Sequence, residues 1–191
     1  MPCANCAPVG APPVPETLFE ITDLAPGDTG TIRQVFSGLS AQSSYQRYQS
    51  ARPNLPIRAQ HGLADVRPGR HVAHVAVLAG RPVGIVRWIR STRSTDATTS
   101  AELAIEVIDA MQRRGIGRLL LARAARSAIA AGLDCFHAYI APGNRSLVRR
   151  MLEYGGVTDR IDPELFRLAV AELYQAVSPG LTGLFDDDRT T

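Results

Sequence analysis

Alternation of apolar and polar residues predicts four strands along the chain. Residues 18–23 (LFEITD), 71–90 (HVAHVAVLAGRPVGIVRWIR) and 101–109 (AELAIEVID) alternate as half-buried strands do. Gly80 interrupts the second of these segments, so a tight turn between two strands is expected there. The run at 135–141 (CFHAYIA) is largely apolar, which is typical of a buried strand, so it adds a fifth predicted strand.

Helical spacing of apolar residues fills several of the gaps between the strands. Residues 28–48 have helical periodicity that breaks at 38–40 (GLS), which predicts two short helices. Residues 114–131 place their apolar side chains on one helical face. A further helix is expected to begin at Asn144, a good N-terminal cap, and to end at Gly155.

Three other segments have weaker patterns. Residues 51–70 are rich in proline and are interpreted as a connection, and residues 91–100 as a polar loop. Residues 163–178 carry two signals, because Asp162 followed by proline favours a helix while the alternation in FRLAVAEL favours a strand. Both structures remain open for this last segment.

Length and composition bound the organisation and the compartment. A chain of 191 residues suits one domain, predicted over 17–178, with a Pro/Ala-rich tail at 1–16 and an acidic tail at 179–191. The 45% hydrophobic and 20% charged content fits a soluble protein, and no apolar run approaches the roughly 18 residues of a membrane span. Without the pattern of a signal peptide, a cytoplasmic location is expected, with no membrane partner.

Cysteines and charges exclude some functions. Cys3 and Cys6 supply only half of a zinc site and Cys135 lies far away, while the three aspartates at 186–188 resemble a solvated run, so no metal is expected. All 21 basic residues are arginine, and the net charge of +3 is scattered. Nucleic acid is therefore not an expected partner, although small anionic ligands are.

The turn at 112–118 (QRRGIGR) lies between a predicted strand and a predicted helix. Unpaired N–H groups at a helix N-terminus, two glycines and three arginines together form a site for a pyrophosphate. A nucleotide-hydrolysing phosphate loop needs a lysine, which this chain lacks. A dinucleotide-binding loop needs a third glycine, and the chain has Leu120 there.

The segment Q-R-R-G-I-G resembles the acyl-CoA loop of the GNAT acetyltransferase superfamily. The preceding AELAIEVID, the later PGN-helix and the order of elements over residues 17–175 extend the resemblance. It implies an α/β (α+β) GNAT fold, with a mixed, mostly antiparallel twisted sheet of about six to seven strands flanked by about four helices. It also implies that the strands at 103–108 and 135–141 splay apart. The segment FSGLSAQSSYQRY resembles bacterial members akin to protein-lysine acetyltransferases.

The resemblance implies a binding site for acetyl-CoA. Main-chain groups of Ile105, Glu106 and Val107 are expected to contact the pantetheine arm and the thioester, and Asn144 to contact the cosubstrate from the far side. The expected pyrophosphate contacts are Gln112, Arg113, Arg114, Gly115, Ile116, Gly117 and Arg118.

Acetyl transfer to an amine needs a base and a group that stabilises charge on the thioester carbonyl. The N–H of Val107 is the candidate for the carbonyl, and Glu102 occupies the position of the general base in several protein acetyltransferases. Glu106 is the reserve base; on a regular strand both carboxylates face one side, roughly 13 Å apart. The family's proton-donating tyrosine is replaced by Leu152, and Tyr154 is expected on the wrong helical face.

These features predict an N-acetyltransferase that moves an acetyl group from acetyl-CoA to a primary amine, in a protein lysine or a small molecule, within a ternary complex. The alternative is an inactive acyl-CoA sensor. His71 and His74 are expected on opposite faces of a strand, which excludes a metal pair, and Cys135 is interpreted as a structural thiol rather than a nucleophile. A monomer and a homodimer both remain open.

Overall fold

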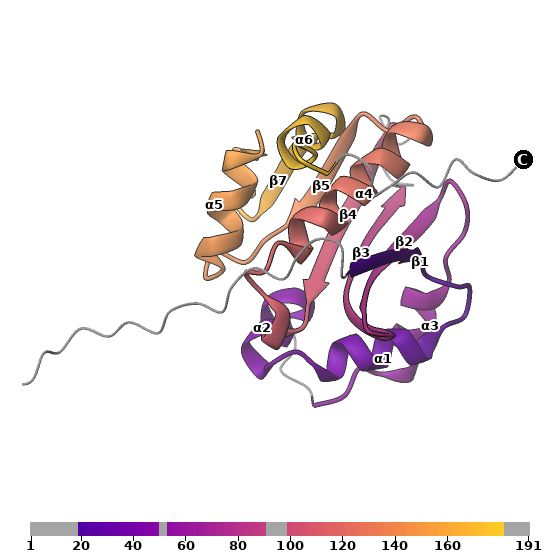
Figure 1. Ribbon diagram of the computed structural model, residues 1–191. Coiled ribbons are helices and arrows are strands. Elements are labelled where there is room, and N and C mark those ends of the chain that lie inside the picture. The colour runs from indigo at the N-terminus through magenta and orange to yellow at the C-terminus, as the bar shows by residue number, and fades with distance from the viewer. Residues whose placement is uncertain (1–18, 50–52, 91–98, 182–191) are drawn as a thin grey trace, which may run out of the picture.

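The computed structural model describes residues 19–49, 53–90 and 99–181, which form one seven-stranded sheet in the order β1-β2-β3-β4-β5-β7-β6 (Figure 1). All neighbouring strands are antiparallel except β4 and β5. The strands are β1 Phe19–Asp23, β2 His71–Leu78, β3 Arg81–Arg90, β4 Ser100–Val107, β5 Cys135–Tyr139, β6 Val157–Thr158 and β7 Leu165–Ala169. The expected mixed, mostly antiparallel sheet of six to seven strands is confirmed.

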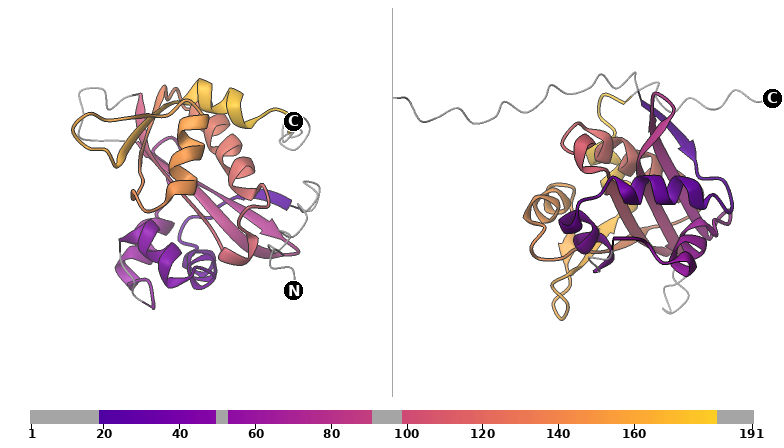
Figure 2. Two further views of the ribbon diagram at one scale, coloured as in Figure 1. Left: turned by 90° about the vertical axis from the view of Figure 1, so that its left-hand side faces the viewer. Right: turned by 90° about the horizontal axis from the view of Figure 1, so that it is seen from below.

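Helices cover both faces of this sheet (Figure 1, Figure 2). The helices α4, α5 and α6 lie on one side, and α1, α2 and α3 gather on the other. Their bounds are α1 Thr29–Ser37, α2 Ala41–Tyr48, α3 Ile57–Ala64, α4 Ile116–Ala130, α5 Arg145–Glu153 and α6 Val170–Val177, with a short 3-10 turn, η2, at Asp109–Met111. The described residues therefore form more helices than the expected four.

Each face of the sheet has its own apolar core. On the side of α4, Trp88 and Phe136 pack with Leu120 and its neighbours. On the side of α1, Ile32 and Ile85 belong to a smaller apolar cluster. Burial of each such side chain contributes about 1.5–3 kcal/mol, so the sheet is held rigidly between two layers. None of the helices in the described part of the chain is long and apolar enough to cross a membrane.

Local signals placed several elements correctly. Asp28 and Ser40 cap α1 and α2 by accepting hydrogen bonds from the main chain of Thr31 and Ser43. The turn between β2 and β3 has positive φ at both Ala79 (49°) and Gly80 (74°). Two such residues match the right-handed twist of paired strands, so the predicted tight hairpin is confirmed.

The expected connection at 51–70 is wrong in part, because residues 57–64 form α3. This helix has eight residues, begins after Pro56 and buries only Ala64, so its local pattern is short and weak. Packing against α1 stabilises it instead. Leu181, which lies within the tail expected from 179, is buried in the core.

The ambiguous segment at 163–178 contains both a strand and a helix. Residues 165–169 form β7, which pairs with β5, and residues 170–177 form α6. The side chain of Asp162 accepts a hydrogen bond from the main chain of Glu164, so it closes a turn instead of capping a helix. The predicted tail at 1–16, residues 182–191 and most of the polar loop at 91–100 lie outside the described residues.

The parallel pair β4–β5 is short. Ser100, Ala101 and Glu102 pair with Cys135, Phe136 and His137, and the pairing ends there. Beyond this point β5 continues along β7, while β4 continues along β3 without any register shift. The expected splay of the two strands is therefore present, and it needs no bulge in β4.

Candidate active site

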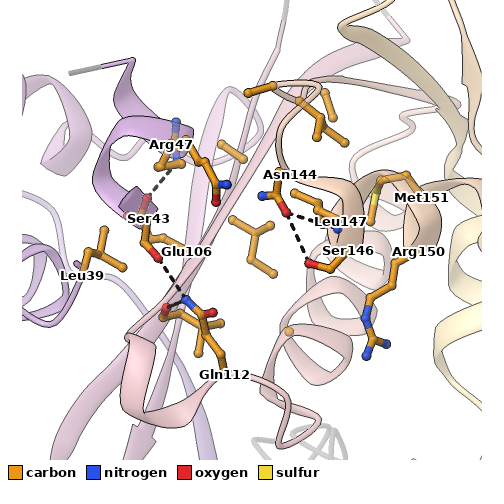
Figure 3. Close-up of a pocket in the computed structure, with 18 of the residues that line it drawn as sticks. Leu39, Ser43, Arg47, Glu106, Gln112, Asn144, Ser146, Leu147, Arg150 and Met151 are labelled. Atoms are coloured by element: carbon orange, nitrogen blue, oxygen red, sulfur yellow. Dashed lines mark hydrogen bonds and ion pairs between the residues drawn. The ribbon is translucent and has the colours of Figure 1, made fainter. Parts of the chain in front are cut away.

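A main cleft of about 870 Å³ opens where β4 and β5 part (Figure 3). Its walls come from α2, the second half of β4, the turn at 109–118, the end of β5 and α5. Elements far apart in the sequence thus enclose one elongated space between the two layers of helices. We refer to this space as the main cleft.

The register of β4 decides which main-chain groups face the main cleft. Ile108 donates its N–H to Val83 at 3.0 Å, so these residues form a hydrogen-bonded pair across β3 and β4. Because such pairs alternate along an antiparallel ladder, the N–H and C=O groups of Ile105 and Val107 point away from β3 and into the gap. Those of Glu106 point toward β3. Glu106 therefore does not offer its main chain to the cleft, contrary to the expectation.

The turn before α4 has little side-chain cover. Arg113 and Gly115 have positive φ values of 61° and 89°, and Gly115 is the N-terminal cap of α4, without a side-chain capping bond. A Cβ atom added to Gly115 would have no neighbour within 4 Å. The main-chain N–H groups of the first turn of α4 are thus exposed to the cleft with the positive end of the helix dipole.

Four residues of the expected anion site have different surroundings. The side chain of Gln112 donates to the carbonyl of Val107 at 3.1 Å and so braces the turn. Arg113 lines the main cleft and Arg114 is not among the lining residues. The side chain of Ile116 is buried in the core, which leaves only its main chain available to a ligand.

Arg118 is committed in part to another element. Its guanidinium donates to the carbonyl of Val177 at 2.9 Å and to the carbonyl of Pro179. These are the last carbonyls of α6 and its extension, which have no helical partner of their own. Arg118 lines the cleft but also fastens the end of α6 to the start of α4.

Asn144 lies across the cleft from the turn. Its side-chain oxygen accepts from the N–H of Leu147 at 3.2 Å and from the hydroxyl of Ser146 at 3.3 Å. The predicted cap of α5 is confirmed. Figure 3 shows the amide nitrogen of Asn144 pointing into the cleft, where it can donate to a ligand.

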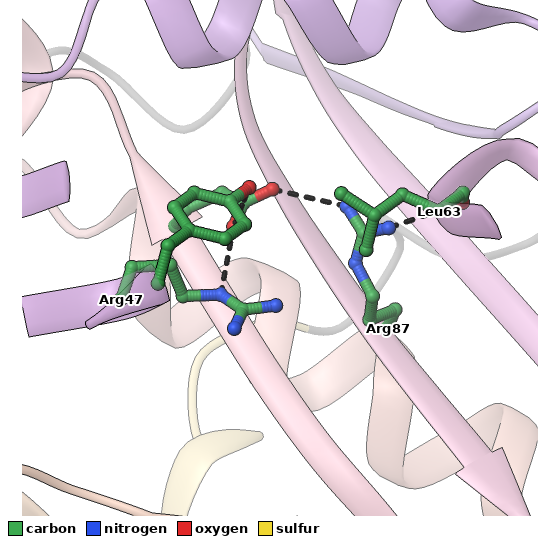
Figure 4. A network of polar contacts seen from close by, with 5 residues as sticks. Arg47, Leu63 and Arg87 are labelled. Carbon is green, nitrogen blue, oxygen red and sulfur yellow. Dashed lines mark hydrogen bonds and ion pairs between the residues drawn. The ribbon is translucent and has the colours of Figure 1, made fainter. Parts of the chain in front are cut away.

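Glu106 lies in a buried network on the opposite face of β4 from the α4 core. One carboxylate oxygen accepts from Arg47 at 2.8 Å and from the hydroxyl of Tyr48 at 2.9 Å, and the other accepts from Arg87 at 3.0 Å (Figure 4). Burial acts to raise the pKa of Glu106, but the two guanidinium groups hold it below its usual value. The pKa of Tyr48 is raised, mainly by burial and also by the nearby Glu106 carboxylate.

A carboxylate with a lowered pKa and three donors is a poor proton acceptor. The surroundings of Glu106 therefore argue against its reserve role as a base. Its side chain instead anchors α2 to the sheet, through Arg47 and Tyr48, and fills the polar centre of that face. The alternation along β4 does not separate Glu102 from Glu106, since they share a face; the family resemblance ranked Glu102 first, and the structure shows that they differ in what covers them.

Glu102 is exposed and lies at the junction of two cavities. It lines the main cleft and also a small cavity of about 370 Å³ between α3 and the sheet. Among the described residues, the only others that line both cavities are Arg47, Tyr48 and Ala104. A carboxylate at this junction can accept a proton from a group that enters through one cavity and reacts in the other.

Tyr154 lines the main cleft, and the expectation that it lies on the wrong helical face is incorrect. The side of α5 that faces the cleft is formed by Leu147, Arg150 and Met151, to which Tyr154 is related by helical spacing. Leu152, at the position of the family's tyrosine, is 53% exposed and points elsewhere.

The two histidines of β2 lie on opposite faces, as predicted. His71 contacts the carbonyl of Asp65 at 2.8 Å, whereas His74 contacts Asp23 at 2.6 Å and Ser127 of α4 at 2.9 Å. The described residues contain no group of three or more side chains able to hold a metal ion.

The order Asp23, His74, Ser127 resembles a hydrolytic triad but lies outside both cavities. The hydroxyl of Ser127 also accepts from Trp88 at 2.9 Å and contacts the carbonyl of Ala124 at 3.0 Å. These contacts hold α4 on the sheet.

Cys135 also lies outside both cavities, and burial raises the pKa of its thiol. A thiol with a raised pKa forms little thiolate near neutral pH, which agrees with a structural role.

Known proteins share this fold. The GNAT domain of PAT from S. lividans is 24% identical, with a TM-score of 0.70 over 78% of this chain and 87% of that one. An acetyltransferase of the GNAT family from Streptococcus pneumoniae is 19% identical, with a TM-score of 0.62 over 79% and 98%. Spermidine N-acetyltransferase from Vibrio cholerae, solved with CoA and spermine, is 16% identical, with a TM-score of 0.62 over 83% and 99%.

The sequence comparison defines the family. Residues 36–155, more than half of the chain, match the family model for the acetyltransferase (GNAT) family. The matched region runs from the end of α1 to the end of α5 and so includes β4, the bare turn and the cap of α5. The chain is therefore a member of the GNAT acetyltransferase family.

Proposed function

We propose that this protein is an N-acetyltransferase that transfers an acetyl group from acetyl-CoA to a primary amine within a ternary complex. The observation that carries the proposal is the parting of β4 and β5 beside the bare N-terminus of α4. Together they provide an extended main-chain edge for a pantetheine arm and a cluster of N–H donors for a pyrophosphate. Membership of the family supports the same acyl donor.

In this proposal Ile105 and Val107 hydrogen-bond the pantetheine through their main chains, and Gly115, Gly117 and Arg113 surround the pyrophosphate. The N–H of Val107 faces the cleft and donates to the thioester carbonyl oxygen, where negative charge develops during attack. Because the donor is part of a rigid sheet, it needs no reorganisation at that moment.

Glu102 serves as the base. The substrate amine enters as an ammonium ion and must lose a proton before its nitrogen can attack the carbonyl carbon. Glu102 accepts that proton, directly or through one water, and the exposed position of its side chain lets the proton pass on to solvent. As the C–N bond forms the C–S bond breaks, the nitrogen releases its second proton, and the leaving thiolate takes up one proton. Tyr154 of α5, which lines the cleft, is a candidate donor of that proton.

An inactive acyl-CoA sensor is the second candidate. It is favoured by the exposed Leu152 at the position of the family's usual proton donor. A thiol pKa near 8.5 lets the thiolate leave without a dedicated acid, so the missing tyrosine does not prevent turnover. The carboxylate of Glu102 at the junction of two cavities favours the enzyme.

Calorimetric titration with acetyl-CoA and with CoA tests the cosubstrate site. Wild type is expected to bind both, and Gly115→Glu to lose binding, because the new carboxylate occupies the pyrophosphate position. Gly132→Glu is the matched control: Gly132 also has positive φ (71°) and open space, but it lies at the other end of α4. Absence of binding by wild type, or equal loss in both variants, would refute the site.

A further inference from the structure

The small cavity lies on the far side of Glu102 from the main cleft. It is bounded by the end of α2, by α3 and by β3 and β4, and its volume of about 370 Å³ is at the lower end of sites for small molecules. Ala59, Leu63 and Ile89 give it an apolar lining. Arg47, Arg87 and Glu102 give it charged groups.

The buried charges beside this cavity do not balance. Arg47 and Arg87 share one carboxylate, Glu106, which leaves one positive charge in excess. Arg47 uses its Nε for that carboxylate, and Figure 4 shows its two terminal nitrogens directed away from it. An excess charge in a partly desolvated site favours an anionic ligand.

Arg87 points to the same conclusion. Its side chain is 2% exposed, and its terminal nitrogens donate to Glu106 at 3.0 Å and to the carbonyl of Leu63 at 3.1 Å. Its Nε is buried and has no hydrogen-bond partner among the described residues. Native proteins rarely leave a buried donor of a charged group unpaired, and Arg87 lines the small cavity, so a negative group of a ligand bound there would lie near this incompletely paired charge.

Glu102 supplies the opposite charge at the mouth of the cavity. No ion pair joins it to Arg47 among the described residues, although its carboxylate is among the charges that act on Arg47. A ligand with a negative group toward Arg47 and an ammonium group toward Glu102 would match both ends. That is the charge pattern of an amino acid.

We propose that the small cavity binds the acceptor and that the acceptor is a compact amine bearing a carboxylate, such as a free α-amino acid with an apolar side chain. The inference rests on the proposed function. The acceptor carboxylate contacts Arg47 and lies near the Nε of Arg87, and its side chain lies against Leu63 and Ile89. The ammonium gives one proton to Glu102, and its nitrogen then forms the C–N bond as the C–S bond of the acetyl donor breaks. The nitrogen releases its second proton, and the CoA thiolate that leaves takes up one proton to become the thiol.

Release of free CoA thiol is measured with the proteinogenic L-amino acids, their carboxamides, spermidine and a lysine-containing peptide at millimolar concentration. At least one apolar amino acid is expected to be acetylated, with kcat/KM at least about thirtyfold above that of its carboxamide. The amine of a carboxamide is less basic and so more often neutral, which means that poor turnover reflects the missing charge.

The discrimination between acid and amide is then measured in Arg47→Gln. The ratio of the two kcat/KM values is expected to fall close to one, because only the acid uses the arginine. This ratio does not depend on the folded fraction, so it stays informative if the variant is less stable. Arg149→Gln is the control, since Arg149 is 75% exposed on α5 and lines neither cavity.

Two results overturn the inference. One is that no amino acid is acetylated; turnover of spermidine or the peptide would then leave the proposed function standing. The other is an unchanged ratio in Arg47→Gln. Failure of wild type to bind acetyl-CoA in the titration would instead refute the proposed function itself.

Discussion

At the scale of residues, Glu102 and Glu106 show how burial separates two identical side chains. They lie four positions apart on one face of β4. Glu106 is enclosed by two arginines and a tyrosine, which hold it ionised. Glu102 is exposed between two cavities, where protons can enter and leave. The first suits a structural role and the second suits catalysis.

Replacing Glu102 by glutamine is expected to lower kcat on the order of a hundredfold or more, because the amide cannot accept a proton. Acetyl-CoA affinity is expected to stay unchanged, since the proposed donor site uses the main chain of β4 and the turn. Steady-state kinetics and calorimetry measure the two quantities. Glu20→Gln, an exposed strand glutamate on β1, is the control; full turnover by Glu102→Gln would remove this residue from the mechanism.

At the scale of elements, the main cleft depends on two helix N-termini that face each other. The N-terminus of α4 has no side-chain cap, so main-chain N–H groups there can contact a ligand. The N-terminus of α5 is capped by Asn144. Its side-chain oxygen accepts from the N–H of Leu147, and its side-chain nitrogen faces the cleft. The Asn144 side chain thus makes a structural contact and leaves a donor directed at the cleft.

Asn144→Ala is expected to destabilise the protein by about 1 kcal/mol through loss of the cap and to weaken acetyl-CoA binding several-fold. Asp28→Ala is the matched control, because Asp28 caps α1 away from both cavities. It is expected to cost similar stability with unchanged affinity. Chemical denaturation and calorimetry measure the two effects, and equal affinity of both variants would exclude Asn144 from the donor site.

At the scale of the whole molecule, Glu106 joins three parts of the fold. Arg47 comes from α2, Arg87 from β3 and Glu106 from β4, and Arg87 continues to the carbonyl of Leu63 in α3. Removing one member leaves uncompensated buried charge. The network therefore holds the helices on this face against the sheet.

Glu106→Gln is expected to cost about 3–5 kcal/mol at neutral pH, since two arginines lose their buried partner. The pKa of Glu106 is lower in the folded protein than its ordinary value of 4.5, so the unfolded state binds the proton more readily. The stabilisation that ionised Glu106 provides is present at pH values above its ordinary pKa. It is lost as the pH falls through the pKa of Glu106 in the folded protein.

Urea unfolding at a series of pH values measures this effect. Between the two pKa values, the slope of the unfolding free energy against pH is expected to be smaller in Glu106→Gln by up to about 1.4 kcal/mol per pH unit. Glu102→Gln serves as the control for the loss of one exposed glutamate from the same strand. Identical slopes in all three proteins would contradict the assigned ionisation of Glu106.

The sequence by itself determined the elements with strong local signals. The hairpin at Gly80, the cap at Asn144 and the turn before α4 follow from residue preferences that act over a few positions. The family loop then indicated the order of strands and the place of the cleft.

Only the tertiary structure decided features that depend on distant partners. Helix α3 forms because α1 covers it, and the segment at 165–177 divides into β7 and α6 because β5 offers an edge to its first half. The register of β3 and β4 turned the main chain of Glu106 away from the cleft. Arg47 and Arg87 lie against Glu106, lower its pKa and so give it a different role from Glu102. This difference arises because the protonation of a side chain depends on charges that folding brings close.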